Sequence, residues 1–158
     1  MKKTIFLLLF SFSSALSSAQ TVGRFDHWTV FKTQQGKKTS CYALIRPNKT
    51  NENSKKRKKK PYLMVSVLNN KPFIMLYAGN SFKDFSAIKV CPGEQCYTLH
   101  TKKDRAWAAD EGTEKKIIDA MKNHQFLKVQ LPENAGQNHY ALKGFSKAYD
   151  KLLKCCKP

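Results

Sequence analysis

Cysteines and histidines are the residues of this chain that could form disulfides, bind a metal or act in catalysis. The most specific pattern among them is Cys91-Pro-Gly-Glu-Gln-Cys96. Pro-Gly is typical of a turn, and apolar residues lie on both sides of the segment. A tight hairpin brings two Cβ atoms within the few ångströms that a disulfide requires. A zinc site would need a second pair of ligands at suitable spacing, which the sequence lacks. We therefore predict a disulfide between Cys91 and Cys96.

The other three cysteines predict a second, long-range disulfide. Cys41 stands alone in the first third of the chain, and its candidate partners are the adjacent Cys155 and Cys156. In the chain-entropy model a bridge across so long a loop stabilises the fold by about 4 to 5 kcal/mol. A bond between the two adjacent cysteines would strain the peptide that joins them. We predict that Cys41 pairs with one of the two, with Cys155 as the first choice, so that one thiol is left over.

The histidines do not form a recognisable catalytic motif. Secreted ribonucleases use a pair of histidines as acid and base, but no spacing here places two together among His27, His100, His124 and His139. The sequence has no His-Glu-x-x-His, Gly-x-Ser-x-Gly or glycine-rich phosphate motif. We expect no enzyme activity, no catalytic residue, no metal and no cofactor. A small basic hydrolase that uses histidines is the alternative.

A run of six consecutive cations is the most strongly charged segment of the chain: Lys55, Lys56, Arg57, Lys58, Lys59 and Lys60. The whole chain carries 29 Lys and Arg against 11 Asp and Glu, a net charge of +18. The polar segment 47–60 cannot bury a core, and we expect a mobile loop there. This loop is the predicted contact for anionic polymers of the envelope or of a host surface, with no specific nucleic acid. The alternative is a solvated loop that only keeps the protein soluble.

The first nineteen residues have the layout of a bacterial secretory signal. Lys2-Lys3 precedes an apolar run from Ile5 to Phe10, and small residues end at Ala19, where we expect cleavage. The apolar run is too short to cross a bilayer, which takes about 20 residues. We predict a periplasmic, outer-membrane-associated or secreted protein, and disulfides form readily in such compartments.

The elements that must position these residues are mostly short strands. A length of 158 residues with 41% hydrophobic residues fits one folded domain, over 20–158. Apolar alternation, together with a turn over Asn69–Pro72, predicts nine strands: Phe25–Lys32, Ser40–Ile45, Pro61–Leu68, Phe73–Ala78, Phe85–Cys91, Cys96–Thr101, Arg105–Ala109, Phe126–Leu131 and His139–Leu142. Helical spacing predicts Glu114–Asn123, capped by Thr113, and a last helix from Ser146 to Leu153. This pattern favours an antiparallel β-sandwich with two short helices over a parallel α/β sheet.

Several landmarks in this order resemble the invasion-associated locus B family of exported bacterial proteins. They are Gly23–Val30, Cys41-Tyr42-Ala43, Arg105–Ala108, Ala120–Lys122, Tyr140–Ala148 and the terminal Cys155. The resemblance implies an immunoglobulin-like β-sandwich, residence in the periplasm or at the outer membrane, and a link in some pathogens to host-cell entry. It implies no enzymatic activity and so no catalytic residues.

One departure from the family bears on the disulfides. Many members have a cysteine soon after the first tryptophan, whereas Phe31 and Lys32 stand here. The resemblance therefore favours a C-terminal partner for Cys41. The combined expectation is an exported, non-enzymatic binding protein, monomeric or weakly dimeric, that contributes to host-cell interaction through a cationic surface. A structural periplasmic protein is a further alternative.

Overall fold

The computed structural model describes residues 18–50, 59–68, 71–83, 86–132 and 136–155. Nearly all of the predicted signal peptide lies outside these ranges, and so do the cations Lys55, Lys56, Arg57 and Lys58. What was predicted for those segments stays a prediction. Lys59 and Lys60, at the end of the cationic run, are described and exposed.

The fold is mainly β, with two helices, as predicted. Eleven strands in the described part of the chain join in one antiparallel sheet, in the order β1-β2-β3-β5-β6-β9-β8-β7-β10-β11-β4. Their bounds are β1 Gln20–Phe25, β2 Trp28–Gln35, β3 Lys38–Ile45, β4 Lys49–Thr50, β5 Tyr62–Leu68, β6 Lys71–Tyr77, β7 Ala87–Pro92, β8 Tyr97–Lys102, β9 Arg105–Trp107, β10 Phe126–Gln130 and β11 Gln137–Ala141. The helices are α1 Glu111–Asn123 and α2 Phe145–Cys155. The immunoglobulin-like arrangement of two sheets stays a prediction.

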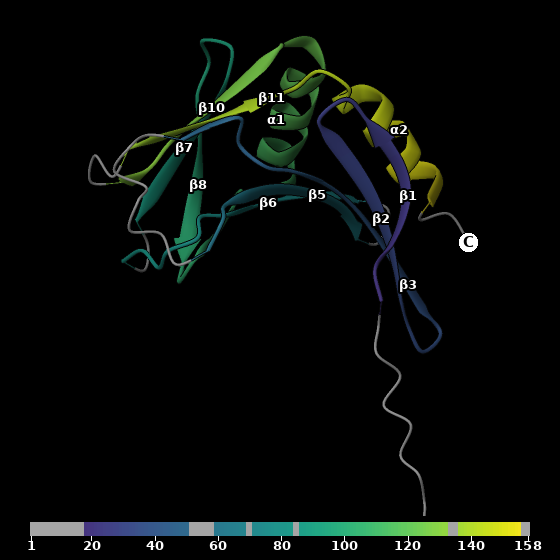
Figure 1. The fold of residues 1–158 in the computed structure, drawn as a ribbon. Helices are drawn as coiled ribbons and strands as arrows, with labels where there is room; N and C mark the ends of the chain where they lie inside the picture. Colours follow the sequence, from purple (N-terminus) through teal and green to yellow (C-terminus); the bar gives the residue numbers. More distant parts are fainter. Residues whose placement is uncertain (1–17, 51–58, 69–70, 84–85, 133–135, 156–158) are drawn as a thin grey trace, which may run out of the picture.

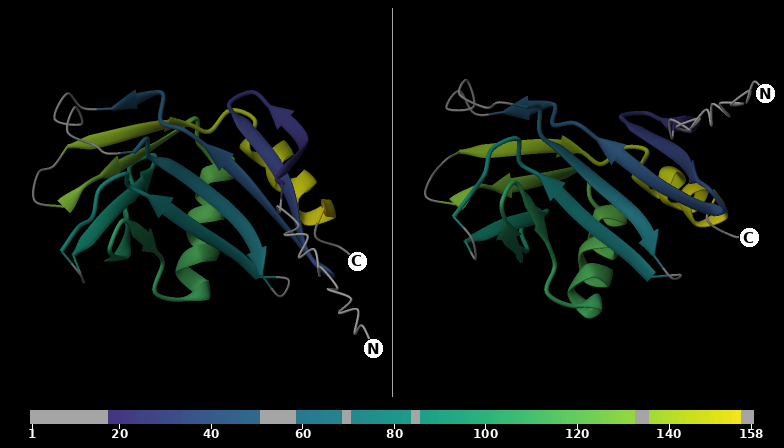
Figure 2. Two further views of the ribbon diagram at one scale, coloured as in Figure 1. Left: turned by 60° about the horizontal axis from the view of Figure 1, so that its bottom comes forward. Right: turned by 90° about the horizontal axis from the view of Figure 1, so that it is seen from below.

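The sheet curves into an arch that carries the core on its inner side (Figure 1). Alternate residues of neighbouring strands are fully buried, as Val30 in β2, Ala43 in β3 and Val65 in β5 show. Helix α1 packs against β6 and β7, whereas α2 packs against β1, β2 and β3 (Figure 2). Apolar side chains from both helices complete the core, with Ile117 and Met121 from α1 and Leu152 from α2.

The first predicted strand is wrong at its start, because the chain reverses there. Phe25 in β1 pairs with Trp28 in β2, and Asp26 and His27 form the turn between the two strands. Asp26 adopts a φ of 50°, a left-handed conformation that aspartate tolerates better than most residues. A two-residue turn of this kind joins antiparallel strands tightly. This β1–β2 turn becomes one wall of the cleft described below.

The predicted cap of the first helix is also wrong. Asp110 caps α1, because its Oδ1 accepts a hydrogen bond of 2.9 Å from the backbone N–H of Thr113. The Thr113 hydroxyl donates to the other carboxylate oxygen, also over 2.9 Å. These bonds lower the pKa of Asp110, since they favour its ionised form. The helix therefore begins three residues earlier than predicted, at Glu111.

The predicted loop over 47–60 begins with a short strand. Lys49 and Thr50 form β4, which pairs with His139 and Asn138 at the edge of the sheet. The backbone N–H of Asn48 also donates to the carbonyl of His139 over 2.9 Å. The pairing partner comes from β11, far along the sequence, so the local polar composition could not reveal it.

Candidate functional site

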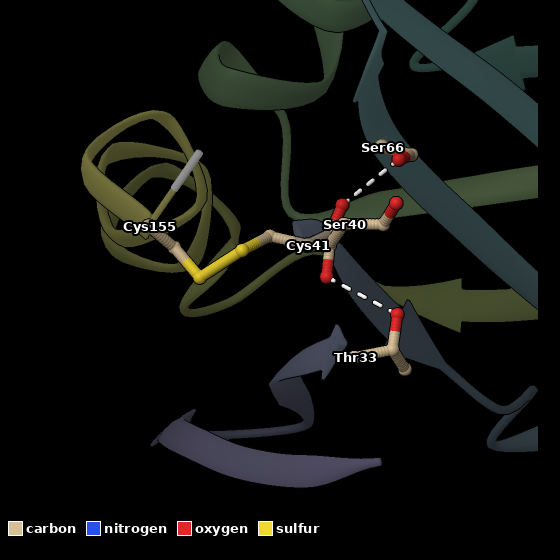
Figure 3. Close-up of a disulfide and its surroundings, with 5 residues drawn as sticks. All are labelled: Thr33, Ser40, Cys41, Ser66 and Cys155. Carbon is tan, nitrogen blue, oxygen red and sulfur yellow. Dashed lines mark hydrogen bonds between the residues drawn. A yellow bond between two sulfur atoms is a disulfide. The ribbon is translucent and has the colours of Figure 1, made fainter. Parts of the chain in front are cut away.

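A disulfide between Cys41 and Cys155 joins the sheet to the C-terminal helix (Figure 3). Cys41 is fully buried in β3, and Cys155 is the last residue of α2, 114 positions later. The Ser66 hydroxyl donates to the carbonyl of Cys41 over 2.8 Å, which links β3 to β5 at the same point. The bond fixes the far end of α2 against the sheet. The near end of α2 lines a cleft.

A second disulfide closes the turn between β7 and β8. Cys91 and Cys96 are bonded, with their Cα atoms 4.1 Å apart. Inside this turn Gly93 has a φ of 70°, and a Cβ added to it would lie 2.4 Å from Cδ2 of the His124 ring. The disulfide-closed turn therefore packs directly on His124.

A cleft of about 630 Å³ lies where four segments meet. The β1–β2 turn contributes Asp26 and His27, and the end of α1 contributes Lys122. The start of β10, with the two residues before it, contributes His124, Gln125 and Phe126, and the corner between β11 and α2 contributes Ala141, Leu142, Lys143, Gly144, Ser146 and Lys147. Segments far apart in the sequence thus build this cleft.

Gly144 allows the β11–α2 corner to touch the β1–β2 turn. Its φ is 88°, and a Cβ added to it would lie 2.2 Å from the carbonyl oxygen of Phe25. Beneath the corner, the rings of Trp28 and Phe145 pack with centroids 4.8 Å apart, at an angle of 49°. An ion pair of 3.2 Å between Lys143 Nζ and Asp26 Oδ1 crosses the same contact. The close approach of the two main chains, the packing of the two rings and the ion pair together fix the β11–α2 corner against the β1–β2 turn.

The cations of the cleft differ in how far they are neutralised. Lys122 Nζ lies 3.7 Å from Asp119 and 4.5 Å from the centre of the Tyr149 ring. Burial raises the pKa of Tyr149, and the charge of Asp119 raises it further, so the ring carries a neutral hydroxyl. Lys143 pairs with Asp26, whereas exposed Lys147 has no ion pair within the described part of the chain.

The fold brings two histidines to one cleft, which the sequence did not reveal. His27 comes from the β1–β2 turn and His124 from the residue after α1. His124 Nδ1 lies 2.8 Å from the carbonyl oxygen of Ala120. Because a carbonyl only accepts, Nδ1 carries the hydrogen of this bond, and Nε2 is the nitrogen that can accept in the neutral ring. His100 in β8 and His139 in β11 do not line this cleft.

An exposed aromatic side chain lies in the cleft lining. Phe126, the first residue of β10, keeps 56% of its surface exposed. Leu153 on α2, at 36%, is the other large hydrophobic residue exposed in the described structure. Phe126 pairs across the sheet with Ala141, which also lines the cleft. The cleft lining thus combines apolar residues with lysines.

A second, shallower cleft of about 410 Å³ lies between β6 and the start of α1. It contains Glu114, whose buried carboxylate accepts a hydrogen bond from Ile74 N–H, and the exposed ion pair between Lys71 and Glu111. Burial raises the pKa of Glu114 to about 7. Across the described ranges, no group of three His, Cys, Asp or Glu residues is placed to hold a metal ion, and no helix has the length and apolar character to span a membrane.

The comparisons with known proteins show the fold. No family model matches the chain, and no curated protein matches its sequence. Among solved structures, the crystal structure of invasion associated protein B from Bartonella henselae is similar, with a TM-score of 0.59 and 17% sequence identity. The match covers 87% of this chain and 96% of that one. The resemblance seen in the sequence is thereby confirmed at the level of the fold.

Proposed function

We propose that this chain is an exported, non-enzymatic binding protein of the bacterial envelope or its exterior, which binds anionic polymers through a cationic surface. Its charge is the observation that carries the proposal. Eleven acidic residues cannot neutralise 29 cations, which leaves a net charge of +18, or 27 minus 11 = +16 once the predicted signal peptide with Lys2 and Lys3 is removed. Binding of such a surface to a polyanion is favourable, because the lysines and arginines release the counterions that had condensed on the polyanion.

Two further observations support this function. The two disulfides fit an oxidising compartment outside the cytoplasm. The fold is also that of a protein described as invasion associated. We propose that the present chain acts at a host surface, and that the cationic run 55–60 makes the first contact there.

Chromatography on heparin, a sulfated glycan, tests the proposal. In one variant the six cations of 55–60 are replaced by Gln. A matched variant loses six exposed lysines elsewhere: Lys37, Lys38, Lys89, Lys102, Lys115 and Lys116. Both variants carry the same net charge, so only the position of the lost charge differs. We expect wild type to elute at the highest salt concentration and the 55–60 variant at the lowest.

The same experiment has two outcomes that would overturn parts of the proposal. Equal elution of the two variants would show that the whole charged surface binds and that 55–60 has no special role. Elution of all three proteins at the same salt concentration would refute polyanion binding through this charge.

One observation favours a second candidate function, a hydrolase of phosphodiesters. His27 and His124 share a cleft with lysines, and an acid, a base and cations are what cleavage of such a bond requires. Turnover of a fluorogenic RNA substrate tests it, with a His27→Ala/His124→Ala variant purified in the same way. Turnover in wild type alone would establish the hydrolase. Equal turnover in both, or none in either, would exclude it.

A further inference from the structure

We propose that the cleft between the β1–β2 turn, the end of α1 and the start of α2 binds a single-chain anionic amphiphile. Its acidic head group binds at Lys143 and Lys147, and its apolar chain covers Phe126. This proposal does not depend on the polyanion contact proposed for 55–60.

The lining of the cleft has two chemical characters. Lys143, at the corner, pairs with Asp26 of the β1–β2 turn, and Lys147 also lines the cleft. The apolar part follows the paired ends of β10 and β11, with Phe126, Ala141 and Leu142. The backbone N–H of Leu142 donates to the carbonyl of Gln125 over 2.7 Å, so a main-chain hydrogen bond joins the two segments of this apolar part. A ligand with one acidic end and one apolar end matches both parts.

The charge balance of the lining favours an anion. Three lysines line the cleft, and the two carboxylates that pair with them, Asp26 and Asp119, leave one positive charge. Asp26 already pairs with Lys143, and Lys147 has no ion pair among the described residues. Helix α2 starts at the same corner, and a helix N-terminus adds a partial positive charge. Lys147 is therefore the cation best placed to bind an incoming acid group.

The exposed ring of Phe126 is the reason to propose an amphiphile as the ligand and not a simple anion. A phosphate ion alone would leave 56% of this side chain in water, as it is now. An alkyl chain that covers the ring removes apolar surface from water, which is favourable at about 25 cal/mol per Å². The cleft, at about 630 Å³, is within the range of about 300 to 1,000 Å³ that small-molecule sites occupy.

Isothermal titration with three probes tests this proposal on the full mature chain. Dodecyl phosphate, below its critical micelle concentration, carries both the head and the tail. Inorganic phosphate carries only the head, and dodecyl maltoside carries the tail with an uncharged head. We expect dodecyl phosphate to bind at one site per chain, about tenfold or more tighter than either partial probe.

Matched variants locate the site. Lys147→Gln and Phe126→Ser are each expected to weaken dodecyl phosphate binding about tenfold. Lys38→Gln removes an exposed lysine outside the cleft, and Leu153→Ser removes the other exposed apolar side chain. Both control variants are expected to bind as wild type does. All four changes are at exposed side chains, and circular dichroism confirms that each variant is folded.

Three results would overturn the inference. The first is a loss of binding in the control variants equal to that in the cleft variants. The second is equal affinity for dodecyl maltoside, which would reduce the binding to contact with a detergent tail. The third is equal affinity for inorganic phosphate, which would leave an anion site without a tail. The variant neutralised at 55–60 is expected to keep full affinity, so failure here and failure on heparin are distinguishable.

Discussion

The backbone N–H of Ile74 in β6 donates a hydrogen bond of 2.9 Å to the carboxylate of Glu114 in α1. Glu114 keeps only 6% of its surface exposed. Burial raises the pKa of its carboxyl to about 7; the bond from Ile74 opposes this shift and the charge of Asp110 adds to it. The contact between α1 and the sheet therefore contains a carboxylic acid that stays protonated in the folded protein at pH values where an exposed glutamate is ionised.

This raised pKa predicts a pH-dependent stability with a defined sign. The folded protein binds the proton of Glu114 more tightly than the unfolded chain does, whose pKa is near 4.5. The contribution of this proton to the free energy of unfolding is thus complete below pH 4.5 and is lost as pH rises through about 7. The loss is about 3 kcal/mol as an order of magnitude.

Urea unfolding of Glu114→Gln at pH 4.5 and pH 8 measures this contribution. Glutamine keeps an oxygen for the bond from Ile74 and does not ionise. We expect the variant to gain stability relative to wild type as pH rises. Glu111→Gln, at an exposed neighbour, should follow the wild-type pH dependence apart from its ion pair with Lys71. An identical pH dependence in Glu114→Gln and wild type would contradict the prediction.

The two disulfides are predicted to stabilise the fold unequally. Cys41 and Cys155 are 114 positions apart, whereas Cys91 and Cys96 are 5 apart. In the chain-entropy model the long loop contributes about 5 kcal/mol and the short loop about 2 kcal/mol. Urea unfolding of the Cys41→Ala/Cys155→Ala variant should show the larger loss. A larger loss in Cys91→Ala/Cys96→Ala would reverse this order and count against it.

Gly144 is predicted to be a position where a methyl group cannot fit. Gly144→Ala meets both a positive φ and the carbonyl of Phe25 at 2.2 Å. Gly36 has a φ of 60° with nothing within 4 Å of an added Cβ, so Gly36→Ala has the backbone strain alone. We expect about 1 kcal/mol of loss at Gly36 and at least about 2 kcal/mol at Gly144. Thermal denaturation measures the stability of the two variants. Equal losses of stability would show that the β11–α2 corner shifts to accommodate the methyl group.

The hydrogen bond between His124 and the carbonyl of Ala120 is predicted to fix one tautomer of the ring on which Gly93 packs. In neutral His124 the hydrogen lies on Nδ1, which donates to Ala120. Long-range nitrogen–proton NMR spectra of the imidazole distinguish the two tautomers. Gly93→Ala should shift the ring signals of His124, because the new Cβ would lie 2.4 Å from Cδ2. The Nε2–H form in wild type, or unchanged ring signals in the variant, would contradict this geometry.

Local signals in the sequence predicted the hairpins but not the contacts between them. The β5–β6 hairpin and the β7–β8 hairpin each follow from apolar strands around a turn-forming segment. The turn at Asp26 was missed because large residues on both sides made Phe25–Lys32 look continuous. The cap by Asp110 was missed because Thr113 suits the same role, and only hydrogen-bond geometry distinguishes the two.

The cleft was beyond sequence reasoning for a different reason. His27 and His124 are brought together by the close approach of Gly144 to Phe25 and by the packing of Trp28 on Phe145. Neither contact has a local signature. The sequence around Gly144 does not show that this residue needs a positive φ, which follows only from the contact of the β11–α2 corner with Phe25.

On the proposed export into an oxidising space, the positions of the two disulfides would also impose an order on oxidation. Cys91 and Cys96 would emerge almost together, so their bond could close while the residues after Cys96, more than a third of the chain, are still to come. Cys41 would emerge early and wait for Cys155, which lies 114 positions later. During that interval its thiol is open to exchange with an oxidoreductase or another nascent chain, and docking of α2 ends the exposure.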